Sequence, residues 1–183
     1  MVSLIISELK REEIPLISEP LRSDLNFDFE FHFNNQLKKK ETVLIAWLRP
    51  DNDTNHILPI GRMLLIWDGE LDLKKVIGVV PNAEKYQTIP AIMRFWIKPE
   101  YRSRGFGWQM LLFAQNLAQK KGYKSISLAV YEDNQKAYFL YKKFGFIDSD
   151  VPPFMLEPPF VINGQYEYDK SKVMRYLVKS IDN

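Results

Sequence analysis

Cysteine is absent from this 183-residue sequence, and histidine occurs only at His32 and His56. Without cysteine the chain has no disulfides, no thiolate metal ligands and no cysteine nucleophile. The two histidines are far apart and do not form a His-Glu-x-x-His pattern, which argues against a zinc hydrolase. We interpret both as surface or loop histidines and expect no metal site.

A charge excess and a long apolar run are also missing. The 25 basic residues nearly balance the 23 acidic ones, and a net charge near +2 gives no support to a nucleic-acid partner. Apolar runs such as residues 43–48 are too short to span a membrane, and the first residues lack the pattern of a secretory signal. With 46% hydrophobic residues, the sequence predicts one soluble, cytoplasmic domain over residues 1–183, without a membrane partner.

Residues 91–122 are the most informative stretch that is present. Residues 91–97 are apolar or aromatic apart from Arg94, which predicts a short strand buried on both faces. From Trp108 onward, apolar residues recur at helical spacing; they are Met110, Leu111, Ala114, Leu117 and Ala118. The sequence therefore predicts a strand, a loop and an amphipathic helix in direct succession.

The junction between this strand and helix predicts an anion-binding loop. Gly105 and Gly107 allow a tight turn and a close approach of a ligand to the backbone. The unpaired N–H groups of the first helical turn, together with the helix dipole, favour an anion at the same point. Arg102 and Arg104 lie beside the loop, and residues 98–124 contain six basic residues against the single acid Glu100; they are Lys98, Arg102, Arg104, Lys120, Lys121 and Lys124. Taken alone, the glycines fit an ordinary turn equally well, and the pattern is neither a P-loop nor a complete dinucleotide-binding motif.

The remaining elements follow from periodicity and turn residues. Other strands are expected at residues 3–9, 43–48, 61–67, 76–80, 125–130 and 172–179, with 61–67 and 76–80 forming a hairpin, and a short helix is expected at 11–19. A second amphipathic helix is expected to begin at Asp133 or Asn134 and to end at Gly145. The proline-rich residues 150–164 are interpreted as a loop packed on the body or covering a pocket.

Phenylalanine alternates with polar residues at positions 27, 29, 31 and 33. A period of two predicts a strand. The neighbouring asparagines and the Lys38-Lys39-Lys40 run are also compatible with a loop and a helix, so both interpretations stay open for residues 21–40.

Two segments together resemble the GNAT superfamily of acetyltransferases. In IKPEYRSRGFG, Arg102, Gly105 and Gly107 match that family's Arg/Gln-x-x-Gly-x-Gly/Ala loop. In LAVYEDNQKAYFLYKKFGF, the matching residues are Asn134, Ala137, Leu140, Tyr141, Gly145 and Phe146. The resemblance is tight over residues 90–147, which would form the cofactor-binding core, and poor over residues 10–60. It implies an α/β (α+β) GNAT fold, with a central mixed, twisted sheet of about six to seven strands flanked by helices on both faces.

The resemblance also implies which residues bind acetyl-CoA. The pyrophosphate is expected on the loop formed by Arg102, Ser103, Arg104, Gly105, Phe106, Gly107 and Trp108. The pantetheine arm is expected to run beside the backbone of Phe95 and Ile97, with Asn134 on its other side. Tyr141 lies two helical turns, about 10 Å, beyond Asn134, so it would sit by the thioester sulfur as the general acid. The competing interpretation of Tyr141 is an aromatic core residue of the helix.

A general base is not identified. Many relatives place an acid on the central strand, whereas this strand has Arg94 and no acid. Glu84, Glu132 and Asp133 are the available carboxylates, directly or through water, and each is better explained as a solvated loop charge. Arg94 would pair either with an acidic group of the acceptor or with an acid inside the fold.

The sequence therefore predicts an acyltransferase that moves the acetyl group of acetyl-CoA directly to a primary amine of a small molecule or peptide. The alternative is a non-catalytic CoA-binding sensor or interaction module with the same fold, and an acyl group larger than acetyl is a third option. The acceptor, expected to be set by residues 21–49 and the proline-rich loop, is not readable beyond a preference for a cationic small molecule or peptide amine. A homodimer through an exposed strand or the proline-rich segment is compatible with the sequence.

Overall fold

The computed structural model describes residues 3–21, 27–49, 57–155, 160–162, 165–167 and 172–182. Its strands are β1 (Ser3–Glu8), β2 (Glu41–Arg49), β3 (Leu58–Ile66), β4 (Ala91–Ile97), β5 (Ser125–Tyr131), β6 (Ile147–Asp148), β7 (Phe154–Met155), β8 (Phe160–Ile162), β9 (Gln165–Glu167) and β10 (Val173–Ser180). Its α-helices are α1 (Ile14–Ile17), α2 (Phe29–Leu37), α3 (Leu71–Lys75), α4 (Phe106–Lys120) and α5 (Gln135–Phe144). Three 3-10 turns are η1 (Arg11–Glu13), η2 (Ala83–Tyr86) and η3 (Pro99–Tyr101). His56 lies outside the described residues.

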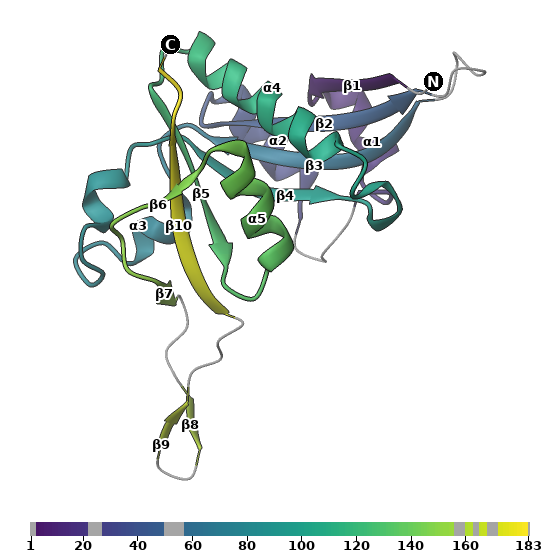
Figure 1. Cartoon of the computed structure of the whole chain (residues 1–183). Helices are drawn as coiled ribbons and strands as arrows, with labels where there is room; N and C mark the ends of the chain where they lie inside the picture. Colours follow the sequence, from purple (N-terminus) through teal and green to yellow (C-terminus); the bar gives the residue numbers. More distant parts are fainter. Residues whose placement is uncertain are drawn as a thin grey trace.

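A mixed sheet forms the centre of the molecule (Figure 1). Its strand order is β1-β2-β3-β4-β5-β10-β6, and β7 also pairs with β10. Neighbouring strands are antiparallel except β4 and β5, which are parallel. β8 and β9 form a separate two-stranded hairpin. The predicted mixed sheet is confirmed; its eight strands include the two-residue pieces β6 and β7.

Helices cover both faces of this sheet. Side chains of a strand alternate between the two faces, and the central strands have apolar residues on both. On β2, Val43 and Ile45 belong to the hydrophobic cluster that holds α1 and α2. Leu44 and Ala46, on the opposite face, belong to the cluster that holds α4 and α5. The predicted layering of helices on both faces is therefore confirmed.

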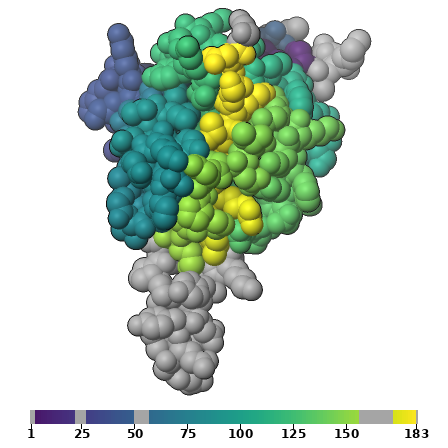
Figure 2. Space-filling model, turned by 60° about the vertical axis from the view of Figure 1, so that its left-hand side comes forward, coloured from purple at the N-terminus to yellow at the C-terminus, as the bar shows by residue number. Residues whose placement is uncertain are grey.

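A third cluster lies on the part of the sheet formed by β5 and β10. It joins Leu73 of α3, Ala83 of η2 and Tyr176 of β10 to Val151 and Phe154 from the proline-rich segment. Figure 2 shows residues 71–90 beside residues 147–155, and Asp150 accepts hydrogen bonds there from Lys85 and Tyr86. The expectation that the proline-rich segment packs on the body holds for residues 150–155, while residues 156–159 lie outside the described part.

The strand predicted from the alternating phenylalanines is wrong, because residues 29–37 form helix α2. The Asp28 side chain accepts a hydrogen bond from the N–H of Phe31 and so caps the helix. Phe29 and Phe33, four residues apart, are buried on the sheet, whereas Phe31 is 58% exposed. The alternation thus reflects a helix with a narrow apolar face and one exposed aromatic residue.

The strand predicted at residues 76–80, and with it the hairpin to residues 61–67, is also wrong. The segment after β3 forms α3, whose first turn is capped by the Glu70 carboxylate through the N–H of Leu73. Leu73 and Val76 enter the third cluster at helical spacing, while Val79 is 82% exposed. The apolar residues 76–80 therefore do not form one element: Val76 lies at the buried end of α3, and Val79 lies in a turn that faces solvent.

Candidate functional site

β4 and β5 separate soon after they begin. The two strands pair only at Ala91 with Ser127 and at Ile92 with Leu128 within the described chain. Beyond this point β4 keeps its other neighbour, β3, up to Ile97. The side of β4 that faces β5 therefore offers backbone groups to an extended ligand, as an unpaired strand edge does.

A β-bulge lies where β4 leaves β5. Arg62 of β3 pairs with Trp96 and Leu64 pairs with Met93, so β4 has one residue more than β3 in this interval. Arg94 is the bulged residue, with a φ of 51°, and its side chain is exposed. The bulge changes which side chains face the helices, and the strand predicted to be buried on both faces is only partly buried.

The extra residue turns the second half of β4 toward α4 and α5. Ile92 faces the α4–α5 cluster before the bulge, and Phe95 and Ile97 face the same cluster after it. Met93 and Trp96 pack toward the α1–α2 cluster. The two residues expected to run beside the pantetheine arm are therefore on the face that carries the predicted anion-binding loop.

The loop between β4 and α4 forms a concave set of backbone N–H groups. Ser103 and Gly105 both have positive φ values, 59° and 82°, and Gly105 is the N-cap of α4. No acceptor for the N–H groups of residues 103–108 occurs in the described structure. Alternating left-handed and right-handed conformations of this kind form an anion-binding nest, which the positive end of the helix reinforces. α4 begins at Phe106, two residues before the predicted start.

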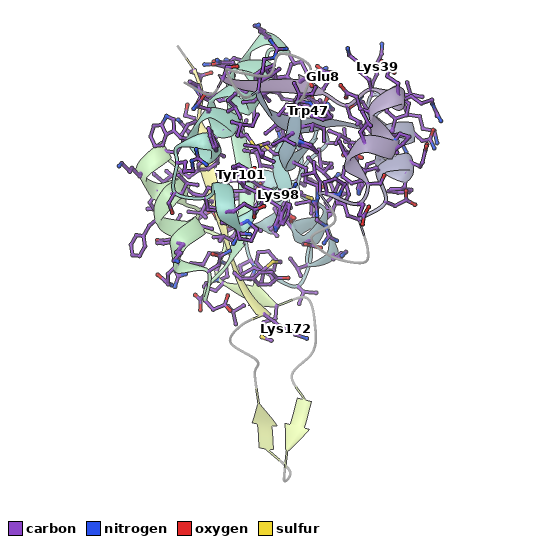
Figure 3. The ribbon with its side chains drawn as sticks, turned by 90° about the vertical axis from the view of Figure 1, so that its right-hand side faces the viewer. Glu8, Lys39, Trp47, Lys98, Tyr101 and Lys172 are labelled. Atoms are coloured by element: carbon purple, nitrogen blue, oxygen red, sulfur yellow. The ribbon has the colours of Figure 1, made fainter. Side chains whose placement is uncertain are left out.

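The basic residues of the loop have different positions. Arg102 donates from Nε to the carbonyl oxygen of Ile97 over 2.8 Å. The Arg104 guanidinium carbon lies 5.4 Å from the ring centre of Phe106 and 5.7 Å from that of Tyr101. Figure 3 shows Lys98 and Tyr101 in the same connection after β4. Arg102 thus joins the loop to the end of β4, while Arg104 lies over aromatic rings at its surface.

Gly107 brings three elements together. A Cβ placed on Gly107 would lie 3.5 Å from Leu140 of α5, 3.5 Å from Phe95 and 3.6 Å from Ile97 of β4. The start of α4 therefore packs against both α5 and the diverging end of β4. The residues that the sequence assigned to one site, 95–108 and α5, are adjacent in the fold.

Asn134 caps α5. Its Oδ1 accepts a hydrogen bond from the N–H of Ala137 at 3.3 Å, which selects Asn134 over Asp133 as the N-cap. The helix ends as predicted at Gly145, whose φ is 103°. The amide Nδ2 of Asn134 is not used by the cap and remains available as a donor.

Tyr141 is 8% exposed on the inner face of α5, with its ring edge-on to Phe146 at 6.0 Å. Burial raises the pKa of its phenol above the ordinary value, so the hydroxyl stays protonated at neutral pH. Tyr138, one turn earlier, instead donates its hydroxyl to Asp148 over 2.9 Å. Both tyrosines contact the α4–α5 cluster, but Tyr141 is a buried member of it whereas Tyr138 is only partly buried.

Each of the three candidate carboxylates is either paired or exposed in the described structure. Glu132 is paired with Arg175 at 2.7 Å, and Glu84 and Asp133 are exposed. Sequence reasoning missed Glu70, which is 1% exposed and whose pKa is raised to about 7, chiefly by burial. Its carboxylate caps α3, so in this conformation it is a structural group and does not face a ligand. The hairpin expected between residues 61–67 and 76–80 makes the segment that contains Glu70 a turn, which concealed its role as a helix cap.

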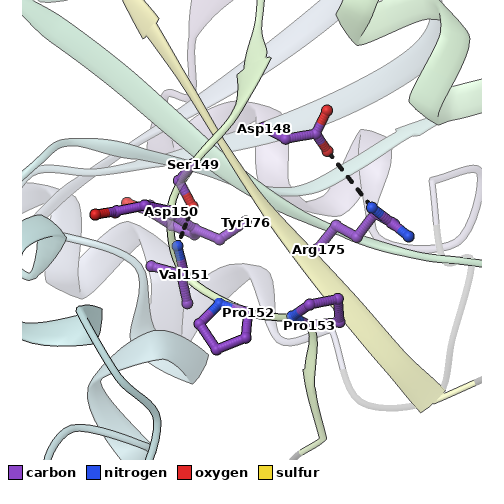
Figure 4. Close-up of a pocket in the computed structure, with 8 residues that line it drawn as sticks. All are labelled: Asp148, Ser149, Asp150, Val151, Pro152, Pro153, Arg175 and Tyr176. Carbon is purple, nitrogen blue, oxygen red and sulfur yellow. Dashed lines mark hydrogen bonds and ion pairs between the residues drawn. The ribbon is translucent and has the colours of Figure 1, made fainter.

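A separate pocket of about 240 Å³ lies at the far edge of the sheet (Figure 4). Residues 148–153, Arg175 and Tyr176 line it, and Arg175 contacts Asp148 at 3.9 Å. It is on β10 and β6, on the other side of β5 from the loop 102–108. No cluster of metal-ligating side chains, and no helix with the length and apolar character to cross a membrane, is found among the described residues.

Comparison with known proteins identifies relatives over most of the chain. The family model described as "Acetyltransferase (GNAT) family" matches residues 19–146. Spermine/spermidine N(1)-acetyltransferase of Bacillus subtilis is 27% identical over 143 residues, 76% of this chain and 82% of the relative. An uncharacterized N-acetyltransferase of the same organism, YycN, is 30% identical over 149 residues, 75% of this chain and 92% of the relative.

A solved structure supports the fold. Spermidine N-acetyltransferase from Vibrio cholerae, in complex with CoA and spermine, superposes with a TM-score of 0.63 at 17% identity. The superposition covers 97% of this chain and 95% of that protein. The arrangement of a mixed sheet with helices on both faces is therefore shared with an enzyme of known fold.

Proposed function

Because this chain belongs to the acetyltransferase (GNAT) family, and is an N-acetyltransferase by that relationship, we propose that it binds acetyl-CoA at the opening between β4 and β5. The observation that supports this assignment most directly is the parting of β4 from β5 beside a loop of unpaired N–H groups. A single extended ligand with a phosphate group at one end fits both features.

The proposed binding residues divide the cofactor between them. Residues 102–108 hold the pyrophosphate through backbone N–H groups, assisted by the charges of Arg102 and Arg104. The backbone of Phe95 and Ile97 bonds the amides of the pantetheine arm. Asn134 donates from Nδ2 on the opposite side, while its Oδ1 caps α5.

The proposed reaction is a direct transfer. The amine nitrogen attacks the thioester carbonyl, a new C–N bond forms, and the C–S bond breaks with its electron pair on sulfur. The Tyr141 hydroxyl donates a hydrogen bond and then a proton to that sulfur. A phenol is protonated throughout the neutral range, and the raised pKa of Tyr141 makes it a weaker acid, so its first contribution is the hydrogen bond to the sulfur as negative charge develops there. The attacking nitrogen loses its own proton to water, since β4 has no acid.

The acceptor is proposed to approach from the face of β4 that carries Met93 and Trp96, because the cofactor residues occupy the opposite face. This places α1 and α2 beside the acceptor. Polyamines are the first candidates, since the relatives are named for spermine and spermidine. A cytoplasmic location and a homodimer remain proposals.

A second function, a non-catalytic CoA-binding module, is favoured by one feature. β4 carries no acid, Glu132 is paired with Arg175, and Glu70 is enclosed, so no carboxylate of the described residues is identified as the base for the amine. An acceptor that arrives uncharged at its reacting nitrogen would remove this objection.

Turnover of acetyl-CoA with a panel of amines tests the proposal. The panel contains spermine, spermidine and a peptide with a free α-amine, and free thiol is measured. Tyr141→Phe is expected to lower kcat by about a hundredfold or more with an unchanged Kd for CoA. Tyr138→Phe is the matched control, because its hydroxyl is bonded to Asp148, and it should retain the wild-type kcat. CoA binding without thiol release for any amine would favour the module, and full activity in Tyr141→Phe would remove Tyr141 as the acid.

A further inference from the structure

Arg62 is a charged residue of β3 that is only 1% exposed. A buried guanidinium is stable only when its N–H groups are satisfied by nearby acceptors. Arg62 donates from Nε to the carbonyl oxygen of Leu21 at 3.1 Å and from Nη1 to the carbonyl oxygen of Arg94 at 2.9 Å. Its guanidinium carbon also lies 3.6 Å from the ring centre of Phe27. These contacts come from two different parts of the molecule.

Leu21 and Phe27 belong to the α1–α2 side. Both are buried in the cluster that packs these helices on the sheet. The Phe27 ring also stacks on His32 of α2 at 4.6 Å, with an interplanar angle of 28°, and meets Phe29 of the same helix edge-on at 4.6 Å. His32 in turn contacts Glu41 of β2 through Nδ1 at 2.6 Å, so it is a half-buried helix residue and not the predicted surface or loop histidine. Arg62 is therefore connected to α2 through a stack of two rings.

Arg94 belongs to the acetyl-CoA side. Its carbonyl oxygen is part of the bulge that turns Phe95 and Ile97 toward α4. Phe95 and Ile97 contact the start of α4 at Gly107, and the Ile97 carbonyl oxygen is bonded to Arg102. A movement of the Arg94 carbonyl would shift Ile97, three residues further along β4, and through the Ile97 carbonyl it would reach Arg102 of the anion-binding loop.

We infer that Arg62 is a positioning residue that couples the acceptor side, α1 and α2, to the acetyl-CoA side through the bulge of β4. The inference rests on the proposed location of both substrates. Arg62 reaches neither of them, and acts by fixing the Arg94 carbonyl relative to Phe27. Binding of CoA along β4 therefore orders both the anion-binding loop and α2. Without the Arg62 guanidinium, CoA would order the loop but no longer α2. Coupling of this kind is typically 5-fold to 150-fold in affinity.

Hydrogen exchange of the full chain, with CoA as the probe, tests the coupling. In the wild type, CoA is expected to protect residues 103–109 and also residues 29–37 of α2. Arg62→Lys keeps the positive charge but loses the planar guanidinium with its several N–H donors. In this variant, protection of residues 103–109 is expected to persist while protection of α2 is lost. The Kd for CoA should rise about tenfold. Protection of α2 that is equal in both proteins, or missing from the wild type, would overturn the inference.

A second variant covers the case in which Arg62→Lys does not fold. Phe27→Leu removes the ring from the guanidinium, and faster exchange of residues 95–97 is expected in the ligand-free protein; unchanged exchange there contradicts the coupling. Arg11→Lys is the matched control. Arg11 also lies over a phenylalanine of α2, 5.0 Å from the Phe33 ring, but it is exposed and bonded to Glu30. Arg11→Lys should leave hydrogen exchange unchanged both in residues 29–37 of α2 and in residues 95–97 of β4. If CoA protects no residue of the wild type, the proposed function fails, and the Phe27→Leu comparison still decides the link between α2 and β4.

Discussion

Arg102 and Ile97 are joined by a hydrogen bond from the guanidinium Nε to the main-chain carbonyl, 2.8 Å long. The bond closes the connection between β4 and α4, because its two ends lie on either side of η3. The sequence indicated Arg102 as a phosphate ligand. In the structure it also fixes the shape of the loop that would receive the phosphate.

Replacing Arg102 should therefore weaken CoA more than replacing Arg104. A hydrogen bond to a charged group contributes about 1.5–3 kcal/mol, so Arg102→Ala is expected to raise the Kd for CoA by roughly 10-fold to 100-fold. Arg104→Ala removes an equal charge that lies over Tyr101 and Phe106, and a smaller increase is expected. Titration calorimetry measures both; equal effects would show that charge alone matters.

Gly61→Ala should disturb the end of β4. A Cβ on Gly61 would lie 2.9 Å from the Trp96 carbonyl oxygen and 3.0 Å from Ile97 Cγ1, so the two strands would have to move apart. Overpacking of this kind costs about 1–3 kcal/mol, and the displaced Ile97 should weaken CoA binding as well. Gly78→Ala is the control, because its Cβ would meet open space and only its φ of 83° is unfavourable. Thermal unfolding of both variants with CoA titration separates the two effects, and a wild-type Kd in Gly61→Ala would be contrary to expectation.

Asn134 is expected to have two separable roles. Asn134→Ala removes the cap of α5 and should cost about 1 kcal/mol, a decrease in Tm of about 2–4 °C. Asn134→Asp keeps an oxygen for the N–H of Ala137 but loses the amide donor proposed to hold the pantetheine arm. Both variants should bind CoA more weakly, and only the alanine variant should show the lower Tm. Wild-type affinity in Asn134→Asp would remove Asn134 from the binding site.

Glu70 should make the stability of the protein depend on pH. Burial raises its pKa from 4.5 to about 7, so the folded state holds a proton that the unfolded chain releases. The associated stability is fully present below pH 4.5 and is lost as pH rises to about 7, by about 3 kcal/mol in total. Asp72 and Lys75 on α3 and Tyr176 on β10 are the ionisable groups around it.

Urea unfolding of the wild type and Glu70→Gln between pH 5 and pH 8 measures this effect. The glutamine keeps an oxygen for the N–H of Leu73, so the cap is retained. The free energy of unfolding of the wild type should fall relative to the variant as pH rises. Parallel curves for the two proteins would show that Glu70 ionises normally.

Much of the cofactor side was predictable because it depends on local chemistry. Glycines with positive φ, an asparagine cap and a regular apolar spacing define the elements from β4 to α5, and the structure has each of them. The family relationship independently agrees with that region, since the matched residues 19–146 include it. The roles of individual residues there remain predictions.

The acceptor side was less predictable because its elements depend on tertiary contacts. The period of two in residues 27–33 is typical of a strand. In the structure these residues begin a helix, because Asp28 caps its first turn and its apolar face packs on the sheet. The bulge at Arg94 has no glycine to mark it, and its main-chain carbonyl accepts a hydrogen bond from Arg62, thirty-two residues away in the sequence.

The contacts that Arg62 makes with Leu21, Arg94 and Phe27 also indicate at which positions a mutation would disrupt them. Among the described residues, two of its partners, the carbonyl oxygens of Leu21 and Arg94, are main-chain atoms that are present whatever residues occupy those positions. Genetic variation can thus alter the Arg94 side chain without deleting the bond beneath it. Of the described contacts, those that depend on side-chain identity involve Arg62 and Phe27, so random mutagenesis should find sensitive positions there. The hydrogen bond to the carbonyl oxygen of residue 94 should survive substitution of the side chain at that position.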